Sequence, residues 1–311
     1  MALDAPFSGL SSGLSFGLSS GDLLADRRAD YAEMLAADGD WQGATELLST
    51  TLDLVPRWAA GWFRLGELHE KGGNAQAAET AWRQVLALEP DDRFGASLKL
   101  ALLGATPVPD TPPTDFVEAL FDTYAERFET SLVQKLGYCV PDSLGAALRA
   151  AHPDPFFHAL DLGCGTGLMG ARLHPYCAYL EGIDLSAAML RKARKRGIYD
   201  RLRKGDIAAT QFPMGIDLVT AADVLIYVGT LDTVFAKVAA ALQPGGLFGF
   251  SIELSHTEDV LLRESRRYAH SRAYMERELR AAGLRLACVS PETIRTDRGQ
   301  PVQGLVVVAE R

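Results

Sequence analysis

The 311-residue sequence has few cysteines and no long apolar run, and each absence excludes a class of protein. Its four cysteines lie far apart, with no C-x-x-C pair and no histidine at a metal-ligand spacing. This pattern excludes a disulfide framework or a zinc centre and indicates reduced thiols. No stretch of about 18 apolar residues is present, so no membrane span is expected. The first residues also lack the basic and apolar regions of a secretion signal, and we therefore expect a cytoplasmic protein.

Positive charge is also in short supply. The formal net charge is −9 and the sequence pI is about 5.2, which argues against a nucleic acid or an anionic membrane as partner. One basic run, "RKARKRGIYDRLRKG" at residues 191–205, contains Tyr199 as its single aromatic residue. Because base stacking needs interleaved aromatic side chains, we interpret this run as the solvent-facing side of a helix.

The N-terminal stretch is rich in glycine, serine and leucine. Residues 8–21 read "SGLSSGLSFGLSSG", a composition typical of a flexible tail, which we assign to residues 1–22. The regularly spaced Leu10, Leu14, Phe16 and Leu18 leave open the alternative that this segment docks in a groove.

Residues 23–104 contain an internal repeat with a period of 34 residues, in which Gly39 recurs as Gly73 and Ala44 as Ala78. The second copy, "GWFRLGELHEKGGNAQAAETAWRQVLALEP", resembles the tetratricopeptide repeat (TPR), in which small residues let two helices approach closely. The first copy matches less well, and "DDRFGASLKLALLG" is predicted to be a capping helix. We therefore expect a small all-α, TPR-like domain, followed by a Pro-rich linker at residues 105–114.

Residues 115–311 alternate between strand and helix patterns after a first helical stripe over residues 116–136. Strands are predicted near 157–162, 179–184, 201–206, 216–222, 246–253, 284–290 and 304–309, and helices near 168–173, 186–196, 230–242 and 271–282. Such alternation predicts an α/β fold with a mostly parallel sheet that is covered on both faces.

The segment "DLGCGTGLMG", which follows the first predicted strand, contains two overlapping cofactor motifs. Read from Gly165 it is the G-x-G-x-x-G of dinucleotide-binding proteins, and read from Asp161 it is D-x-G-x-G-x-G. The dinucleotide interpretation brings the Asp161 carboxylate close to an anionic pyrophosphate, which is electrostatically unfavourable. S-adenosylmethionine carries an ammonium and a sulfonium and no phosphate, so an acid at this position favours it.

Acidic residues also follow the next strands. Asp184 is suited to bind both ribose hydroxyls, Leu185 and Met189 to contact the adenine ring, and Asp206 with Ile207 to bind the adenine edge. Together with the glycine motif and a later "PGG", this order resembles the class I S-adenosylmethionine-dependent methyltransferases. The resemblance implies a Rossmann-like sheet of seven strands with the last one antiparallel. The cofactor-binding residues that we predict are Asp161, Gly163, Gly165, Thr166, Gly167, Asp184, Leu185, Met189, Asp206, Ile207 and Asp223.

Candidates for the rest of the pocket lie in three segments. Tyr124 and Phe128, one helical turn apart, are predicted to cover the cofactor, with packing on the sheet as the alternative. Tyr227 follows the fourth strand, where similar enzymes have residues that face the substrate. In "SRRYAHS", Arg267 is predicted to bind substrate, and Tyr268 and His270, with Tyr227, are candidate catalytic residues. The metal ligands of catechol-type relatives are missing, so no metal is predicted.

These features predict an S-adenosylmethionine-dependent methyltransferase, with a small molecule favoured over a peptide as methyl acceptor. One alternative is a protein or peptide methyltransferase that docks its substrate on the TPR-like domain, which is also the expected site for a protein partner or for self-association. Another is a non-catalytic scaffold that retains the cofactor-binding domain. The complete series of strand-end acids argues against the scaffold.

Overall fold

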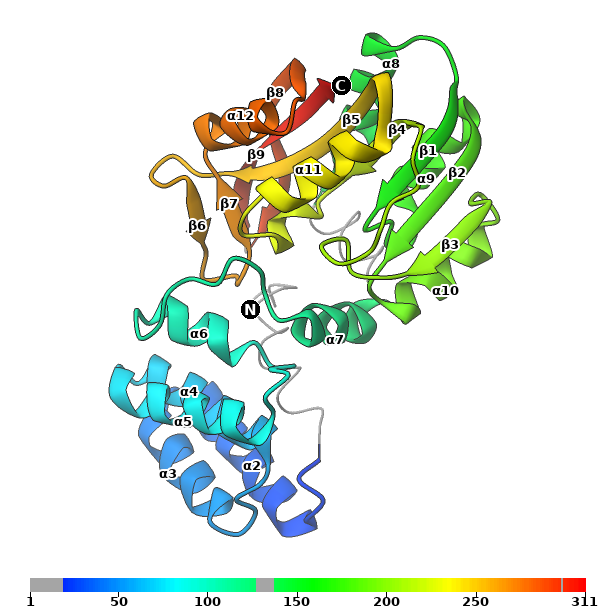
Figure 1. The fold of residues 1–311 in the computed structure, drawn as a ribbon. Coiled ribbons are helices and arrows are strands. Elements are labelled where there is room, and N and C mark those ends of the chain that lie inside the picture. Colours follow the sequence, from blue (N-terminus) through cyan, green and yellow to red (C-terminus); the bar gives the residue numbers. More distant parts are fainter. Residues whose placement is uncertain (1–18, 127–136, 298) are drawn as a thin grey trace. The chain divides into compact units, whose positions relative to one another are not determined.

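A computed structural model describes residues 19–126, 137–297 and 299–311 of the chain (Figure 1). The chain divides into two compact units, Met1–Leu120 and Phe121–Arg311, and each unit is described by itself. The N-terminal tail of the sequence analysis lies almost wholly outside the described residues.

The first unit is built from helices that pack in consecutive pairs. Its helices are α2 (Leu23–Ala37), α3 (Trp41–Leu52), α4 (Ala59–Lys71), α5 (Ala75–Leu88) and α6 (Ala96–Leu102). The turns within the first two pairs use the same chemistry 34 residues apart. Gly39 and Gly73 have positive φ angles of 85° and 76°, and the side chains of Asp40 and Asn74 then cap the second helix of each pair.

Close packing between helices α4 and α5 depends on a glycine opposite a tryptophan. A Cβ atom added to Gly66 would lie 2.3 Å from the indole nitrogen of Trp82, which is itself fully buried. That nitrogen donates a hydrogen bond to the carbonyl oxygen of Phe63 at 3.2 Å. The glycine therefore gives the indole the room that it needs between the two helices.

The second unit contains a mixed sheet with helices on both faces. Helix α7 (Thr114–Tyr124) ends in this unit, and α8 (Val140–Ala151), α9 (Leu168–Leu173), α10 (Ala187–Arg196), α11 (Asp232–Ala241) and α12 (Arg272–Ala281) follow. The strands are β1 (Phe156–Leu162), β2 (Cys177–Asp184), β3 (Arg201–Lys204), β4 (Ile216–Ala221), β5 (Leu242–Leu254), β6 (Val260–Leu262), β7 (Tyr268–His270), β8 (Arg285–Asp297) and β9 (Gln300–Glu310). Short 3-10 helices η2 (His174–Tyr176) and η3 (Leu225–Tyr227) complete the unit.

Seven of the strands form the predicted sheet. Strands β3, β2, β1, β4 and β5 lie side by side and parallel, β9 pairs antiparallel with β5, and β8 pairs antiparallel with β9. The last strand of the chain is therefore the antiparallel one, as the sequence predicted. The Rossmann-like α/β fold of this unit is thereby confirmed.

Two further strands, β6 and β7, were not predicted. Glu253 in β5 pairs with Gly304 of β9 on one side and with Ala269 of β7 on the other. Strand β7 therefore lies on the same side of β5 as β4, which pairs with earlier residues of β5. Strand β4 stops pairing at Phe250, and β7 takes over the same edge from Glu253 onward. The hairpin of β6 and β7 thus extends the sheet beyond the end of β4.

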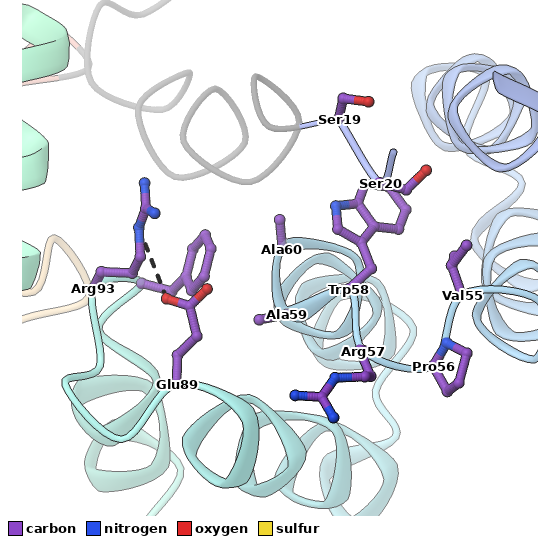
Figure 2. Close-up of a pocket in the computed structure, with 11 residues that line it drawn as sticks. Ser19, Ser20, Val55, Pro56, Arg57, Trp58, Ala59, Ala60, Glu89 and Arg93 are labelled. Atoms are coloured by element: carbon purple, nitrogen blue, oxygen red, sulfur yellow. Dashed lines mark ion pairs between the residues drawn. The ribbon is translucent and has the colours of Figure 1, made fainter. Parts of the chain in front are cut away.

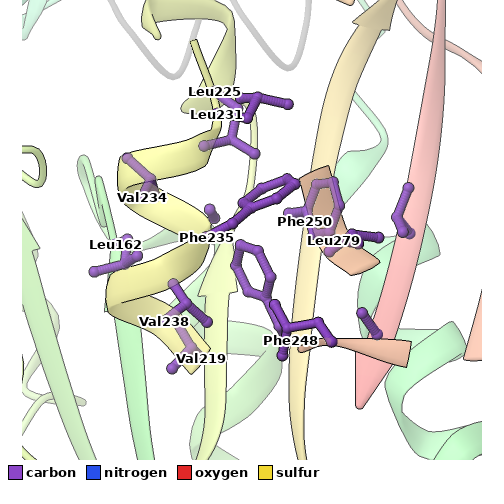
Figure 3. Packing of buried hydrophobic residues seen from close by; sticks show 14 of the residues in the cluster. Leu162, Val219, Leu225, Leu231, Val234, Phe235, Val238, Phe248, Phe250 and Leu279 are labelled. Atoms are coloured by element: carbon purple, nitrogen blue, oxygen red, sulfur yellow. The ribbon is translucent and has the colours of Figure 1, made fainter. Parts of the chain in front are cut away.

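Apolar side chains fill both faces of the sheet. On one face, helices α11 and α12 cover a core in which Phe235 packs against Phe248 and Phe250, with ring centroids 5.6 and 5.3 Å away (Figure 3). On the other face, helices α8 and α9 pack against the sheet. Alternation along β1 directs Leu160 and Leu162 to the first face, which leaves Asp161 for the second.

One helix was missed by the sequence analysis, and one predicted helical stripe is described only in its first half. Helix α8 was not predicted, although Val140, Leu144 and Leu148 are spaced as on one helical face and are fully buried. The stripe predicted over 116–136 is helical from Thr114 to Tyr124, and its second half lies outside the described residues.

Candidate active site

The carboxyl ends of the parallel strands carry the predicted acids. Strand β1 ends in Asp161 and Leu162, β2 ends at Asp184, and Asp206 and Asp223 lie two residues beyond β3 and β4. In a parallel sheet of this type these ends form the ligand-binding edge. The fold therefore brings the four acids to one edge of the sheet.

The glycine loop after β1 depends on backbone that only glycine adopts readily. Gly163, Gly165 and Gly167 all have positive φ angles, of 58°, 55° and 92°. A Cβ atom on Gly163 would also lie 2.4 Å from a methyl carbon of Val224, which follows strand β4. The predicted residue Thr166 is buried in this loop, and its carbonyl oxygen accepts a hydrogen bond from Arg196 at 2.6 Å.

Asp184 joins the glycine loop to the start of helix α10. Its two carboxylate oxygens accept hydrogen bonds from the backbone N–H groups of Gly165 and Ser186, both at 2.8 Å. Burial raises the pKa of Asp184 to about 6, against the lowering effect of these two bonds, and the charge of Asp122 raises it further. The Asp122 carboxylate accepts hydrogen bonds from the Ser186 hydroxyl and from the Ala188 N–H. Two carboxylates therefore lie together at this strand end.

Asp161 is buried and its carboxylate is held by two hydroxyl groups. Tyr199 donates to one oxygen at 2.7 Å and Thr220 to the other at 2.8 Å. Burial raises the pKa of Asp161 to about 6, more than these hydrogen bonds lower it. The ring of Tyr199 packs over the glycine loop and helix α9, since a Cβ on Gly170 would lie 2.2 Å from its hydroxyl oxygen.

Tyr199 was missed as a site residue because it belongs to the basic run that we interpreted as a solvent-facing helix. Helix α10 ends at Arg196, and Tyr199 lies in the turn beyond it. Its ring is partly buried and packs against apolar residues of the core that α8 and α9 cover. The sequence signal that could have identified Tyr199 is that it is the single aromatic residue in the basic run.

The predicted adenine-binding residues lie on the turns after β2 and β3 and, for Met189, in the first turn of helix α10. Met189 is fully buried, and Leu185 is half-buried. The Asp206 carboxylate accepts a hydrogen bond from the Ala208 N–H at 2.8 Å, and the carbonyl oxygen of Ile207 accepts one from Lys237 at 2.7 Å. Lys237, on helix α11, was not predicted, and it fixes the turn that carries Ile207.

Helix α7 carries aromatic side chains near the predicted cofactor-binding residues. Tyr124 is buried, and Phe128 lies outside the described residues. Phe121, one turn earlier on α7, packs against the cluster around Met189 and also meets the ring of Tyr227 edge-on, with centroids 5.2 Å apart. Phe121 thus contacts both the cluster of Met189, a predicted adenine-binding residue, and Tyr227 after β4. The sequence analysis assigned Phe121 only to the helical stripe.

The predicted catalytic segment "SRRYAHS" forms strand β7 and its flanks. Tyr268 and His270 are both fully buried, and the Nε2 atom of His270 lies 2.9 Å from the carbonyl oxygen of Gly229. Burial lowers the pKa of His270. Arg267 donates a hydrogen bond from Nε to the Tyr227 hydroxyl oxygen at 3.2 Å. The fold thus brings Arg267 and Tyr227 together, whereas the catalytic roles of Tyr268 and His270 stay predictions.

Asp223 takes part in an ion pair that the sequence did not indicate. Its carboxylate accepts a hydrogen bond from Arg295 at 2.6 Å, and the same guanidinium also binds Glu253. The Oε2 atom of Glu253 in turn lies 3.1 Å from the Nε atom of Arg263. Asp223 also has a positive φ of 59°, and its N–H donates to the Ser251 hydroxyl at 2.9 Å. The structure therefore places Asp223 in a buried charge network at the end of β4.

Two absences hold for the described part of the chain. Within residues 19–126, 137–297 and 299–311, no three His, Cys, Asp or Glu side chains are grouped so that they could hold a metal ion. Among the described helices, α2 to α12, none is long and apolar enough to cross a membrane.

The helical unit has a pocket of its own (Figure 2). It is lined by apolar residues that include Val55 and Trp58 and by the charged side chains of Arg57, Glu89 and Arg93. Glu89 and Arg93 form an ion pair at 3.9 Å on one wall. The pocket opens beside Ser19 and Ser20, where the described chain begins.

The sheet order, the glycine loop and the strand-end acids define an S-adenosylmethionine-dependent methyltransferase domain of class I. A family model described as a methyltransferase domain matches residues 159–246. This match runs from β1, through the glycine loop, into the first residues of β5.

Similar proteins include several methyltransferases. A trans-aconitate 2-methyltransferase of Acidovorax sp. is 33% identical over 150 residues, which is 46% of this chain and 56% of that protein. An uncharacterized methyltransferase of Mycobacterium bovis is 32% identical over 90 residues, 28% of this chain and 46% of that protein. The chain thus spans about half the length of these relatives.

Solved structures of similar fold include S-adenosylmethionine-dependent methyltransferases of two bacteria. The Mesorhizobium loti protein is 24% identical, covers 55% of this chain and 100% of its own, and has a TM-score of 0.46. The Clostridium acetobutylicum protein is 19% identical, covers 61% of this chain and 98% of its own, and has a TM-score of 0.48.

Proposed function

We propose that this chain is an S-adenosylmethionine-dependent methyltransferase that acts on a small molecule. The observation that carries the proposal is the position of Asp184, which ties the glycine loop to helix α10 at the carboxyl edge of the sheet. The match to a methyltransferase domain covers this segment, and the trans-aconitate methyltransferase among the relatives supports a small acceptor.

The charges of the pocket suit this cofactor. Asp122, Asp161 and Asp184 lie around the glycine loop, and none of the three forms an ion pair with a lysine or arginine in the described residues. A ligand that brings an ammonium and a sulfonium would offset their mutual repulsion, whereas a pyrophosphate would increase it. Gly163, Gly165 and Gly167 would let the backbone pass close to the amino-acid end of the ligand, and Asp184 would bind its ribose.

When bound, S-adenosylmethionine supplies a methyl group on a sulfonium, which is a good leaving group. The protein must then align the acceptor with that methyl carbon and exclude water. Phe121 and Tyr227 meet over the pocket and would serve the second task, and Tyr124 would complete this cover. Asp206, Ile207, Leu185 and Met189 would hold the adenine ring.

Ligand-dependent stabilisation tests the proposed cofactor. S-adenosylhomocysteine at 100 times its dissociation constant should stabilise the full chain by about 2.7 kcal/mol, measured as a rise in the unfolding temperature. Asp184→Ala should remove most of this rise, while Asp154→Ala, which changes an exposed aspartate, should leave it intact. A rise with a nicotinamide dinucleotide and none with S-adenosylhomocysteine would overturn the assignment.

We further propose that residues 23–104 form a TPR-like module that binds a protein partner. The repeated glycine turns at Gly39 and Gly73 and the packing of Gly66 on Trp82 support the assignment. The pocket around Trp58 is a candidate binding surface, and Trp58→Ala should weaken partner capture while methylation of small molecules persists. Equal loss of both activities would instead indicate that the change unfolds the chain.

A further inference from the structure

We propose that the methyl acceptor is a carboxylate of a small organic acid, held by Tyr227 and Arg267 and methylated on a carboxylate oxygen. This inference rests on the proposed methyltransferase function and adds the chemical class of the acceptor. It is built from the position of Tyr227, the direction of its hydrogen bond and the chemistry of the groups around it.

Tyr227 lies next to the cofactor loop. It ends helix η3, which begins one residue after Val224, the residue packed directly against Gly163. Its ring contacts Phe121, which also packs on the cluster around Met189. The phenol therefore lies between Phe121, which contacts the cluster of Met189, and Arg267 at the start of strand β7.

The hydrogen bond from Arg267 fixes the role of the phenol. A guanidinium only donates, so the Tyr227 oxygen accepts from Nε at 3.2 Å. The phenol's own proton must then point to a different acceptor. Among residues 19–126, 137–297 and 299–311, the Tyr227 hydroxyl has no second hydrogen-bond partner. Tyr227 is thus a half-buried donor, backed by a buried cation, and a carboxylate oxygen is the acceptor that best matches it.

The surrounding groups offer little basic character. His270 is fully buried against the Gly229 carbonyl, and Asp223 and Glu253 are both bound to Arg295. A hydroxyl acceptor would need a base to take its proton, and these groups are already bound to Arg295 or to a backbone carbonyl. A carboxylate has already lost its proton at neutral pH, so it reacts without a base.

The reaction balances without a further reactant. A lone pair of the carboxylate oxygen forms the new O–C bond to the methyl carbon, and the C–S bond breaks with its electron pair going to sulfur. The products are a neutral methyl ester and the neutral thioether S-adenosylhomocysteine. The negative acceptor and the positive sulfonium cancel, and no proton is transferred.

The test uses the full chain, S-adenosylmethionine labelled in its methyl group, and matched pairs of acceptors. The acids are succinate, fumarate, citrate and benzoate, and the controls are their amides together with a phenol and an amine. We expect label to be transferred to at least one acid and to none of the amides. Alkali should release that label as methanol, because esters hydrolyse and methyl ethers or methylamines do not.

Two outcomes overturn the inference. One is label that resists alkali, and the other is the absence of transfer to every acid in the panel. Calorimetry with S-adenosylhomocysteine on the same preparation separates these results from a failure of the proposed function. Intact cofactor binding leaves the methyltransferase assignment standing, and lost binding counts against both.

A variant with a matched control tests the phenol of Tyr227. Tyr227→Phe keeps the ring that contacts Phe121 and removes the donor, so the KM for the acid should rise roughly 10- to 100-fold. The affinity for S-adenosylhomocysteine should stay unchanged. Tyr179→Phe, at a partly exposed tyrosine of strand β2, is the matched control and should change neither quantity. An unchanged KM in Tyr227→Phe overturns the inference.

Discussion

Replacement of Asp161 by asparagine should stabilise the ligand-free protein at neutral pH. The carboxylate of Asp161 is 1% exposed and is held by the hydroxyl groups of Tyr199 and Thr220. Burial raises its pKa from the usual 3.8 to about 6. Because the pKa is raised in the folded state, the protonated carboxyl favours folding fully below about pH 4. This contribution is lost as the pH rises through about 6.

The size of the effect follows from the same shift. Each pKa unit corresponds to about 1.4 kcal/mol, so ionised Asp161 disfavours the folded protein by about 3 kcal/mol at pH 7. Asparagine resembles the protonated acid in shape and never ionises. We therefore expect the unfolding temperature of Asp161→Asn to exceed that of the natural chain by roughly 6–12 °C at pH 7.5, at 2–4 °C per kcal/mol. At pH 4 the two proteins should unfold at nearly the same temperature.

Thermal unfolding of both proteins, followed by circular dichroism between pH 4 and 8 without ligand, measures this difference. Asp154→Asn, at an exposed aspartate, is the control and should track the natural chain throughout. Parallel curves for the natural chain and Asp161→Asn would falsify the argument, because they would mean that the carboxylate ionises as easily in the folded as in the unfolded chain.

Three further changes test the packing of the site and of the helical unit. Gly163→Ala adds a Cβ 2.4 Å from Val224 at a positive φ, and should weaken S-adenosylhomocysteine binding at least 10-fold by calorimetry. Gly66→Ala pushes a methyl group into Trp82 and should destabilise the helical unit by about 1–3 kcal/mol in urea unfolding. Arg295→Met removes the cation that Asp223 and Glu253 share, leaving Glu253 with Arg263 alone, and should cost about 3–5 kcal/mol, with soluble yield as a first readout.

Two other glycines serve as controls for the glycine substitutions. Gly73 and Gly197 also have positive φ angles, but a Cβ on either would have no atom within 4 Å. Alanine at these positions introduces backbone strain without an overlap. If Gly163→Ala and Gly197→Ala had the same effect on ligand binding, the contact with Val224 would be irrelevant to the site.

The sequence predicted the seven-strand sheet because its signals are local. Most of those strands contain an apolar run next to a turn or a cap, β3 (Arg201–Lys204) being the exception, and the glycine motif identifies the first of them. Strands β6 and β7 have three residues each, too few to show a period of two. Their pairing depends on β5 continuing beyond the end of β4, which is a property of the folded sheet.

The candidate site was predictable where one residue carries the signal, and unpredictable where the signal lies in a distant partner. Asp161 and Asp184 follow strands directly, so their place at the sheet edge could be read from the sequence. The contact of Asp223 with Arg295 joins residues 72 positions apart, and no local pattern indicates it. The sequence does not distinguish Phe121 from the other apolar residues of its helix, because what marks it as a site residue is its contact with Tyr227 in the folded chain.

Two parts of strand β5 pair with different neighbouring strands. Its first part pairs with β4 and helps to hold the cofactor edge, while its last residues carry the hairpin of β6 and β7, which bears Arg267. The hairpin is bounded by Ser255 and Ser271, which lie directly after the end of β5 and directly before the start of helix α12. Under the proposed function, the hairpin supplies Arg267 to acceptor recognition, while Tyr227 lies outside it, after β4. A different hairpin between these two serines is therefore expected to alter the acceptor preference and to leave intact the part of the chain that binds the methyl donor.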